Sequence, residues 1–121
     1  MQGPLAGIKV IEIGQALAGP LAGAILADMG ADVIKVEKPD GGDDARGWGP
    51  PFVGESSVMF HVTNRNKRSV TLDMKTAADV EKLKALVRDA DILIQNLRSG
   101  VVASLGIGPD DLMAVNPRLI Y

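Results

Sequence analysis

Short apolar runs rich in β-branched residues recur along the chain, and amphipathic or turn-forming segments separate them. The first run, at residues 8–13, is followed directly by Gly14, which is typical of a buried strand that ends in a turn. Runs of the same kind follow, so the pattern predicts five strands. They lie at residues 8–13, 32–37, 69–72, 91–95 and 118–121.

The segments between these runs carry apolar residues at helical spacing. In the stretch 20–29, Pro20 suits the first helical turn and Gly30 suits the position just past the last turn. Thr76 and Asp79 match a capping box, in which the two side chains satisfy backbone donors at the start of a helix. The helix after it presents one apolar face, made of Val80, Leu83, Leu86, Val87 and Ala90. Further short helices are predicted at residues 58–64, 101–105 and 110–115.

Strands that alternate with helices predict crossover connections and a parallel sheet. We therefore expect an α/β protein with a Rossmann-like three-layer fold, in which helices flank a mostly parallel sheet. The chain stops on the last predicted strand with no helix after it, so we interpret residues 1–121 as a truncated segment of a longer protein. Residues 38–57 form a long loop that contains Trp48 and Phe52, and we expect this loop to be ordered and packed.

The composition narrows the class of protein. A chain of 121 residues with 46% hydrophobic residues and a net charge of -2 fits one globular domain with no overall basic field for nucleic acid. There are no cysteines, so disulfides and thiolate metal sites are excluded, and a cytoplasmic location is expected. The apolar stretch 16–29 is interrupted by Gly, Pro and Asp residues and is too short to span a membrane.

Ligands of open parallel sheets bind beyond the carboxyl ends of the strands. Those ends correspond to residues 14–20, 38–42, 73–75 and 96–100. Lys38, Lys75 and Arg98 stand there and can neutralise phosphate charge. Each alone is more typical of an ordinary surface position, and it is their convergence on one sheet edge that favours a binding role. We interpret the acidic residues Asp43, Asp44 and Glu55 as solvated loop charges.

A nicotinamide-dinucleotide site is the rival interpretation. Glu37 ends the second strand, where a ribose-binding acid belongs, but the first turn, from Gly14 to Gly19, does not read G-x-G-x-x-G. On the helix that follows, Ala22, Gly23 and Ala24 leave little side chain, so another group is expected to approach its backbone closely.

Longer motifs carry a resemblance to a known family. The chain is similar to the opening of family III CoA-transferases, the formyl-CoA transferase and carnitine-CoA transferase type. The matching motifs are Pro4-Leu5, Gly7-Ile8, Ala18-Gly19-Pro20, residues 26–37, Arg46-Gly47-Trp48, residues 64–69, residues 72–75, Ala90-Asp91-Ile92 and residues 116–120.

The resemblance implies transfer of coenzyme A from an acyl-CoA donor to a carboxylic acid acceptor, with no metal. In this family an aspartate attacks the thioester and carries the CoA as a covalent intermediate. That aspartate lies beyond Tyr121, so no catalytic residue is assigned in this chain, and the chain alone is expected to be inactive. The resemblance also implies a homodimer whose two full-length chains interlock.

The residues that correspond to the family's CoA-binding positions are Leu17, Ala18, Lys38, Leu72, Met74, Lys75, Asn96, Leu97 and Arg98. Leu17 replaces a frequent Gln, Lys38 replaces a frequent Arg, and Ser104 stands where some relatives have a further Arg. Two alternatives remain open: a 2-methylacyl-CoA racemase of the same fold, and a non-catalytic piece that only binds CoA or only associates.

Overall fold

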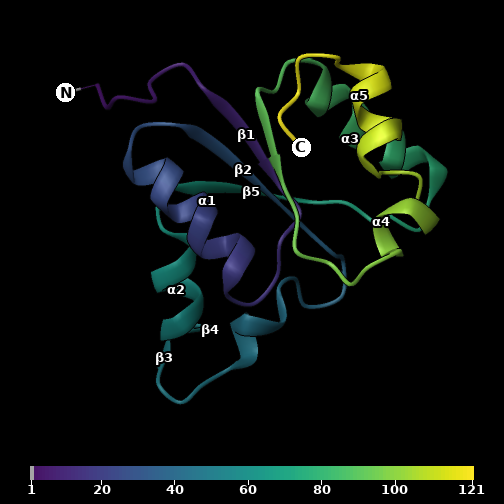
Figure 1. The fold of residues 1–121 in the computed structure, drawn as a ribbon. Helices are drawn as coiled ribbons and strands as arrows, with labels where there is room; N and C mark the ends of the chain where they lie inside the picture. The colour runs from purple at the N-terminus through teal and green to yellow at the C-terminus, as the bar shows by residue number, and fades with distance from the viewer. Residues whose placement is uncertain (1) are drawn as a thin grey trace.

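The computed structural model describes residues 2–121 and contains a four-stranded parallel sheet. Its strands are β1 (Lys9–Glu12), β2 (Asp32–Glu37), β5 (Lys67–Thr71) and β6 (Ile92–Ile94), in the order β5-β2-β1-β6. The chain thus builds outward from β1 to β5 and then returns to place β6 on the other side of β1 (Figure 1). The predicted α/β class with a parallel sheet is confirmed.

Helices cover both faces of the sheet, which gives the three predicted layers (Figure 1). Helix α1 (Ala18–Asp28) packs on one face over a small core that includes Val10, Ala27 and Val33. Helices α3 (Ala77–Arg88) and α5 (Pro109–Val115) pack on the other face. The core beneath them is larger, and its buried members include Ile11, Ile13, Val36, Leu72, Leu83, Val87, Leu93, Ile107, Leu112 and Leu119.

Helix α1 lies very close to the sheet because its inner face is made of small residues. Gly19, Pro20, Gly23, Ala24 and Ala27 are its buried positions. A Cβ atom on Gly23 would lie 2.1 Å from Oε2 of Glu12, so only glycine fits there. The expected close approach to this helix is therefore present, and the approaching group is a strand carboxylate.

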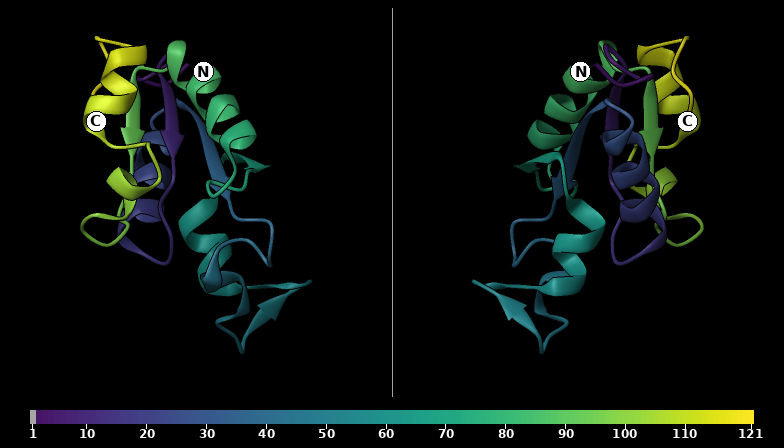
Figure 2. Two further views of the ribbon diagram at one scale, coloured as in Figure 1. Left: turned by 90° about the vertical axis from the view of Figure 1, so that its right-hand side faces the viewer. Right: turned by 90° about the vertical axis from the view of Figure 1, so that its left-hand side faces the viewer.

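The long loop is ordered, and it belongs to the connection that leads along the chain from β2 to β5. The loop contains the 3₁₀ helix η1 (Asp44–Gly47) and a hairpin of β3 (Phe52–Val53) and β4 (Ser56–Ser57), and helix α2 (Val58–Asn64) follows it. The hairpin projects below the sheet, beyond the carboxyl ends of the strands (Figure 2). The predicted order and packing of the loop are confirmed, because Asp43, Ala45, Ser56 and Ser57 are buried. Trp48 and Phe52 themselves remain 51% and 49% exposed.

Two local predictions differ from the structure. The strand expected at residues 118–121 is reduced to one bridge between Ile120 and Ile92, because Pro117 and Arg118 form a turn. The capping box is half formed: Thr76 Oγ1 accepts from the backbone N–H of Asp79, while the Asp79 carboxylate accepts from the N–H of Asp73. The remaining short helix, α4, spans Val101–Ser104. Within residues 2–121, none of the helices has the length and apolar content to cross a membrane.

Candidate functional site

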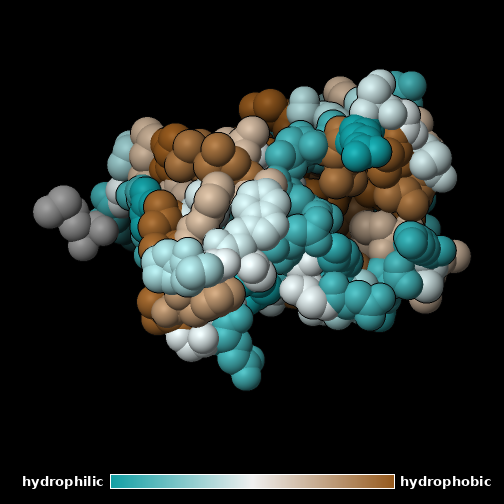
Figure 3. Space-filling model, turned by 90° about the horizontal axis from the view of Figure 1, so that it is seen from below, coloured by the Kyte–Doolittle hydropathy of each residue, from teal (hydrophilic) through white to brown (hydrophobic). Residues whose placement is uncertain are grey.

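A cavity of about 260 Å³ lies at the carboxyl ends of the strands. Figure 3 looks onto this edge of the molecule and shows apolar residues gathered in two areas, with a hydrophilic band between them. Apolar side chains supply much of the cavity wall: Ile13, Val36, Leu72, Met74, Leu97, Val101 and Leu105. Its polar lining residues are Gln15, Glu37, Lys38, Asp73 and Lys75. Apolar walls with a few polar groups are the usual make-up of a small-molecule site.

Five of the predicted site residues line this cavity together. They are Lys38, Leu72, Met74, Lys75 and Leu97, and they come from the ends of three different strands. The other four predicted residues lie outside the lining: Leu17 and Ala18 are exposed at the start of α1, and Asn96 and Arg98 are exposed in the loop after β6.

The charge of Lys38 is held at the rim of the cavity. Its Nζ donates to Oδ1 of Asp44 at 2.5 Å, and this hydrogen bond raises the pKa of Lys38 above its usual value. The side chain is 44% exposed, so the ammonium group is fully charged and accessible at neutral pH. Asp44 is solvated, as expected from the sequence.

An adjoining groove of about 380 Å³ extends the cavity along α3. Met74, Lys75 and Leu105 line both hollows, so the two form one continuous depression. Lys84 of α3 and Ser104 of α4 line the groove as well. Lys84 is therefore a further cation in the groove that Ser104 lines, and its Nζ lies 3.4 Å from Oε1 of Glu81, which lines the same groove.

Beneath the site lies a buried ion network that was not predicted from the sequence. Lys35 Nζ lies 2.8 Å from Oε1 of Glu12 and 2.9 Å from Oδ2 of Asp43. Lys67 Nζ lies 2.6 Å from Oε2 of Glu12 and also donates to three oxygens around the end of α2 and the start of α1. All four side chains are at most 2% exposed. Burial lowers the pKa of Lys67, and the Glu12 carboxylate opposes that shift.

Asp43 corrects the expectation that the loop carboxylates are solvated. It is 2% exposed, because Oδ1 accepts from the backbone N–H groups of Ala16 and Ala45 while Oδ2 faces Lys35. The signal in the sequence was indirect: Glu12 and Lys35 interrupt otherwise apolar strands, and buried charges need partners.

The carboxylate of Glu37 also forms all of its hydrogen bonds within the protein. Its carboxylate accepts from Nε and Nη2 of Arg46, from the backbone N–H of Asp43 and from the hydroxyl of Ser69. Burial alone would raise the pKa of Glu37, but these hydrogen bonds outweigh it and lower the pKa to about 2. A carboxylate held in this way is poorly placed to receive the ribose hydroxyls of a dinucleotide.

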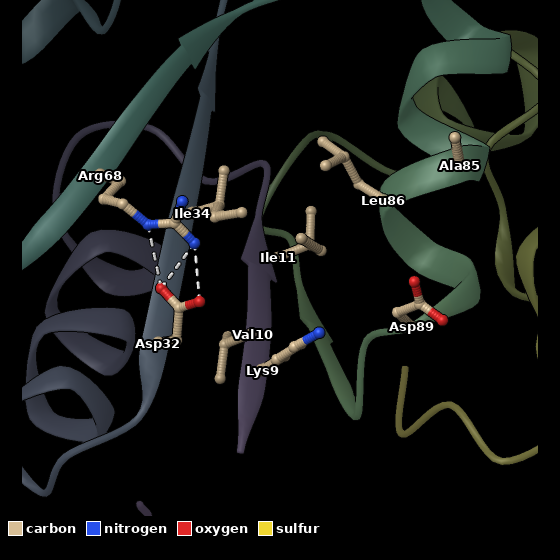
Figure 4. Close-up of a pocket in the computed structure, with 9 residues that line it drawn as sticks. All are labelled: Lys9, Val10, Ile11, Asp32, Ile34, Arg68, Ala85, Leu86 and Asp89. Carbon is tan, nitrogen blue, oxygen red and sulfur yellow. Dashed lines mark hydrogen bonds and ion pairs between the residues drawn. The ribbon is translucent and has the colours of Figure 1, made fainter. Parts of the chain in front are cut away.

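A second cavity, of about 160 Å³, lies toward the amino ends of the strands under α3 (Figure 4). Its charged residues are Lys9, Asp32, Arg68 and Asp89. Arg68 and Asp32 bind one another through three hydrogen bonds of 2.6–3.1 Å, so their charges are largely satisfied. We therefore place the candidate site at the carboxyl edge, where the larger depression lies and where Lys38 and Lys75 line it together.

A model described as CoA-transferase family III matches residues 5–121. The chain belongs to CoA-transferase family III. It is 52% identical over 124 residues to the succinate–glutarate CoA-transferase of Agrobacterium fabrum, covering 98% of this chain and 31% of that protein. It is 42% identical over 118 residues to the succinyl-CoA:glutarate CoA-transferase of Homo sapiens, covering 98% of this chain and 27% of that protein.

Solved structures of the family share the fold closely. A CaiB/BaiF family protein from Brucella suis superposes with a TM-score of 0.94 at 47% identity, covering all of this chain and 33% of that one. The resemblance stated from the motifs is thus confirmed, and this family III chain spans about a third of the length of its relatives. Homologues named as CoA-transferases support CoA thioesters and carboxylates as the substrates of the family.

Proposed function

We propose that this chain is the CoA-binding part of a family III CoA-transferase that moves CoA from an acyl-CoA donor to a carboxylic acid. The observation that carries the proposal is the continuous depression at the carboxyl edge of the sheet. It combines apolar walls at Leu72, Met74 and Leu97 with the lysines Lys38 and Lys75.

This combination suits the two chemically different parts of CoA. The adenine ring needs apolar walls, and the phosphates need cations that keep their charge at neutral pH. Lys38 supplies a point charge without the flat stacking face of an arginine, so we expect it to contact phosphate rather than stack on adenine. Arg98, exposed beside Leu97, is proposed to reach phosphate from outside the cavity.

The start of α1 completes the proposed site. Leu17 and Ala18 are exposed at its first turn, where backbone N–H groups have no partner within the helix. Among residues 2–121, no side chain makes a capping hydrogen bond at this end of α1. We propose that these two residues meet the reacting end of the CoA thioester.

For the acceptor we propose a dicarboxylic acid, because the bacterial and human relatives described above are both named as glutarate CoA-transferases. The nucleophilic aspartate of the family is proposed to lie beyond Tyr121, and the full-length protein is proposed to be an interlocked cytoplasmic homodimer. On this proposal residues 1–121 alone transfer no CoA from succinyl-CoA to glutarate.

Calorimetric titration of the intact protein with CoA tests the binding site. We expect Lys38→Ala and Lys75→Ala each to weaken CoA binding by about tenfold, which corresponds to about 1.4 kcal/mol. Lys82→Ala is the matched control, because Lys82 is an exposed lysine of α3 that pairs with Asp79 and lies outside both hollows. Equal effects from all three variants, or tight binding of NAD, would contradict the proposal.

A further inference from the structure

The turn between β1 and α1 has a backbone conformation that needs external support. Ala16 adopts φ 66°, a left-handed conformation that residues with a Cβ rarely occupy. Such a residue stores of the order of 1–3 kcal/mol and persists only where its surroundings hold it in place. Two side chains from distant loops contact the backbone at this position and at the residue before it.

The first support is the Asn96 side chain, which pairs with Gln15 as a strand would. The backbone N–H of Gln15 donates to Oδ1 of Asn96 at 2.9 Å, and Nδ2 of Asn96 donates to the Gln15 carbonyl at 2.9 Å. Both polar atoms of the side-chain amide are thus engaged, and the two bonds together fix which atom is oxygen and which is nitrogen.

The glycines of this turn make room for the amide. A Cβ on Gly19 would lie 2.9 Å from Oδ1 of Asn96, and a Cβ on Gly14 would lie 3.1 Å from the same atom. Gly14 and Gly19 also approach one another, since the Cβ of either would lie 3.0 Å from the Cα of the other. These two glycines therefore serve the contact between the turn and Asn96.

The second support is Asp43, whose Oδ1 accepts from the N–H of Ala16 at 3.0 Å. Asp43 is itself held by Lys35, which also donates to the carbonyl of Gly14 at 2.9 Å. The turn is consequently anchored at Gly14, Gln15 and Ala16 before any ligand arrives, on one side by the buried ion network and on the other by Asn96.

We propose that Asn96 is a positioning residue that holds the β1–α1 turn, and that its side-chain amide does not itself contact CoA. This inference rests on the proposed function for its ligand. The Asn96 amide joins the loop after β1 to the loop after β6. The chain adds β2 and β5 on one side of β1 and then places β6 on the other side, so the switch point of the sheet lies between β1 and β6. Ligands of open parallel sheets bind at such a point, and Gln15 and Leu97 from these two loops both line the cavity. The bridge therefore fixes one wall of the cavity.

The test uses the intact protein and compares Asn96 with a second asparagine whose side chain also bonds backbone groups. Asn116 also bridges backbone, donating to the carbonyls of Val87 and Ala90 under α3, away from the site. We expect Asn96→Ala to weaken CoA binding by about tenfold and Asn116→Ala to leave it within about twofold. We expect both variants to lose thermal stability, so stability alone does not separate them.

Hydrogen exchange of the ligand-free protein supplies a readout that needs no CoA. In Asn96→Ala the amide of Gln15 loses its acceptor, so the peptide covering residues 13–20 exchanges faster than in the wild type. Asn96→Asp keeps the acceptor and loses the donor, so we expect it to retain slower exchange at Gln15 than Asn96→Ala. In Asn116→Ala the exchange of this peptide is unchanged.

The outcomes separate the two proposals. Weaker CoA binding by Asn96→Ala with unchanged exchange at residues 13–20 makes Asn96 a direct ligand contact and overturns the positioning role. Equal losses of CoA binding in Asn96→Ala and Asn116→Ala, or no loss in either, also overturn it. A wild-type protein that does not bind CoA contradicts the proposed function, while exchange in the free protein still decides whether Asn96 holds the turn.

Discussion

At the scale of single residues, the buried charges organise the carboxyl edge of the sheet. Glu12 and Lys35 are register partners on neighbouring parallel strands, and each would be strongly disfavoured if buried alone. Asp43 and Lys67 balance them, so two carboxylates meet two ammonium groups. Oε2 of Glu12 and Oδ2 of Asp43 are held by ion-pair contacts rather than by aligned hydrogen bonds. Removing one partner, or displacing one, leaves an uncompensated charge in the interior.

Gly23→Ala tests how tightly this network is packed. The added Cβ would lie 2.1 Å from Oε2 of Glu12, and the two lysines prevent the carboxylate from moving away. We expect the unfolding free energy to fall by about 3 kcal/mol. This value is the upper end of the usual cost of overpacking and the lower end of the usual cost of breaking a buried ion pair. Denaturant unfolding measures it.

Gly47→Ala is the control for Gly23→Ala. A Cβ on Gly47 meets nothing within 4 Å, so its effect is expected to stay within about 0.5 kcal/mol. A Gly23→Ala variant as stable as Gly47→Ala would show that α1 shifts easily and that the network is loosely packed.

Glu37→Gln tests the pH dependence that the Arg46 pair creates. The pKa of Glu37 is about 2 in the folded protein, below its ordinary value of 4.5. The folded state therefore keeps this carboxylate unprotonated at lower pH than the unfolded state does. The stabilisation is therefore present above about pH 4.5 and is lost as pH falls toward about 2. We expect Glu37→Gln to be less stable at pH 7 and to lose less stability than the wild type between those two pH values.

Unfolding free energies measured at a series of pH values provide the comparison. The exposed Glu55 supplies the matched variant, Glu55→Gln, which should follow the wild-type curve. If Glu37→Gln keeps the full wild-type loss of stability across this window, the acid sensitivity arises at other carboxylates.

At the scale of elements, periodicity predicted the regular parts of the chain well. The strand at 32–37 and the helix at 58–64 have the same bounds in the structure. The hairpin of β3 and β4 was not predicted, because two-residue strands carry no readable alternation. The hairpin region depends on tertiary contacts, such as the hydrogen bond from Arg46 to Ser56 and the stacking of Arg46 on Phe60.

The start of α3 allows a test of capping at this scale. Thr76 Oγ1 accepts from the N–H of Asp79, one of the donors at the start of the helix that lack a partner within it. We expect Thr76→Ala to lower the unfolding free energy by about 1 kcal/mol, while Thr76→Ser, which keeps the hydroxyl, changes it little. Thermal unfolding of both variants measures the difference. Equal stabilities of the two variants would mean that Asp79, which binds the N–H of Asp73, caps this end alone.

At the scale of the whole molecule, topology explains which parts of the site the sequence could reveal. Residues that directly follow strands, such as Lys38, Leu72 and Lys75, could be placed together, because parallel strands end at one edge. The role of Asn96 could not be read in this way. Its partner Gln15 is 81 positions away, and nothing in the linear pattern tells whether an amide faces a ligand or a neighbouring backbone. Asp43 was misassigned for the same reason.

The outer face of α1 carries the last prediction. Leu17, Leu21, Ile25 and Met29 recur every four residues and are 39–50% exposed, so they form one apolar stripe on the helix. Such stripes favour association, since burial of apolar surface contributes about 25 cal/mol per Å². We therefore expect the 121-residue chain to self-associate as its concentration rises.

The double variant Leu21→Lys/Ile25→Lys should remain monomeric at concentrations where the wild type does not. Met113→Lys, which changes an exposed residue on α5, is the control and should associate like the wild type. Sedimentation velocity that shows a single monomeric wild-type species over a wide concentration range would contradict this prediction, and it would mean that the stripe tolerates solvent in this fold.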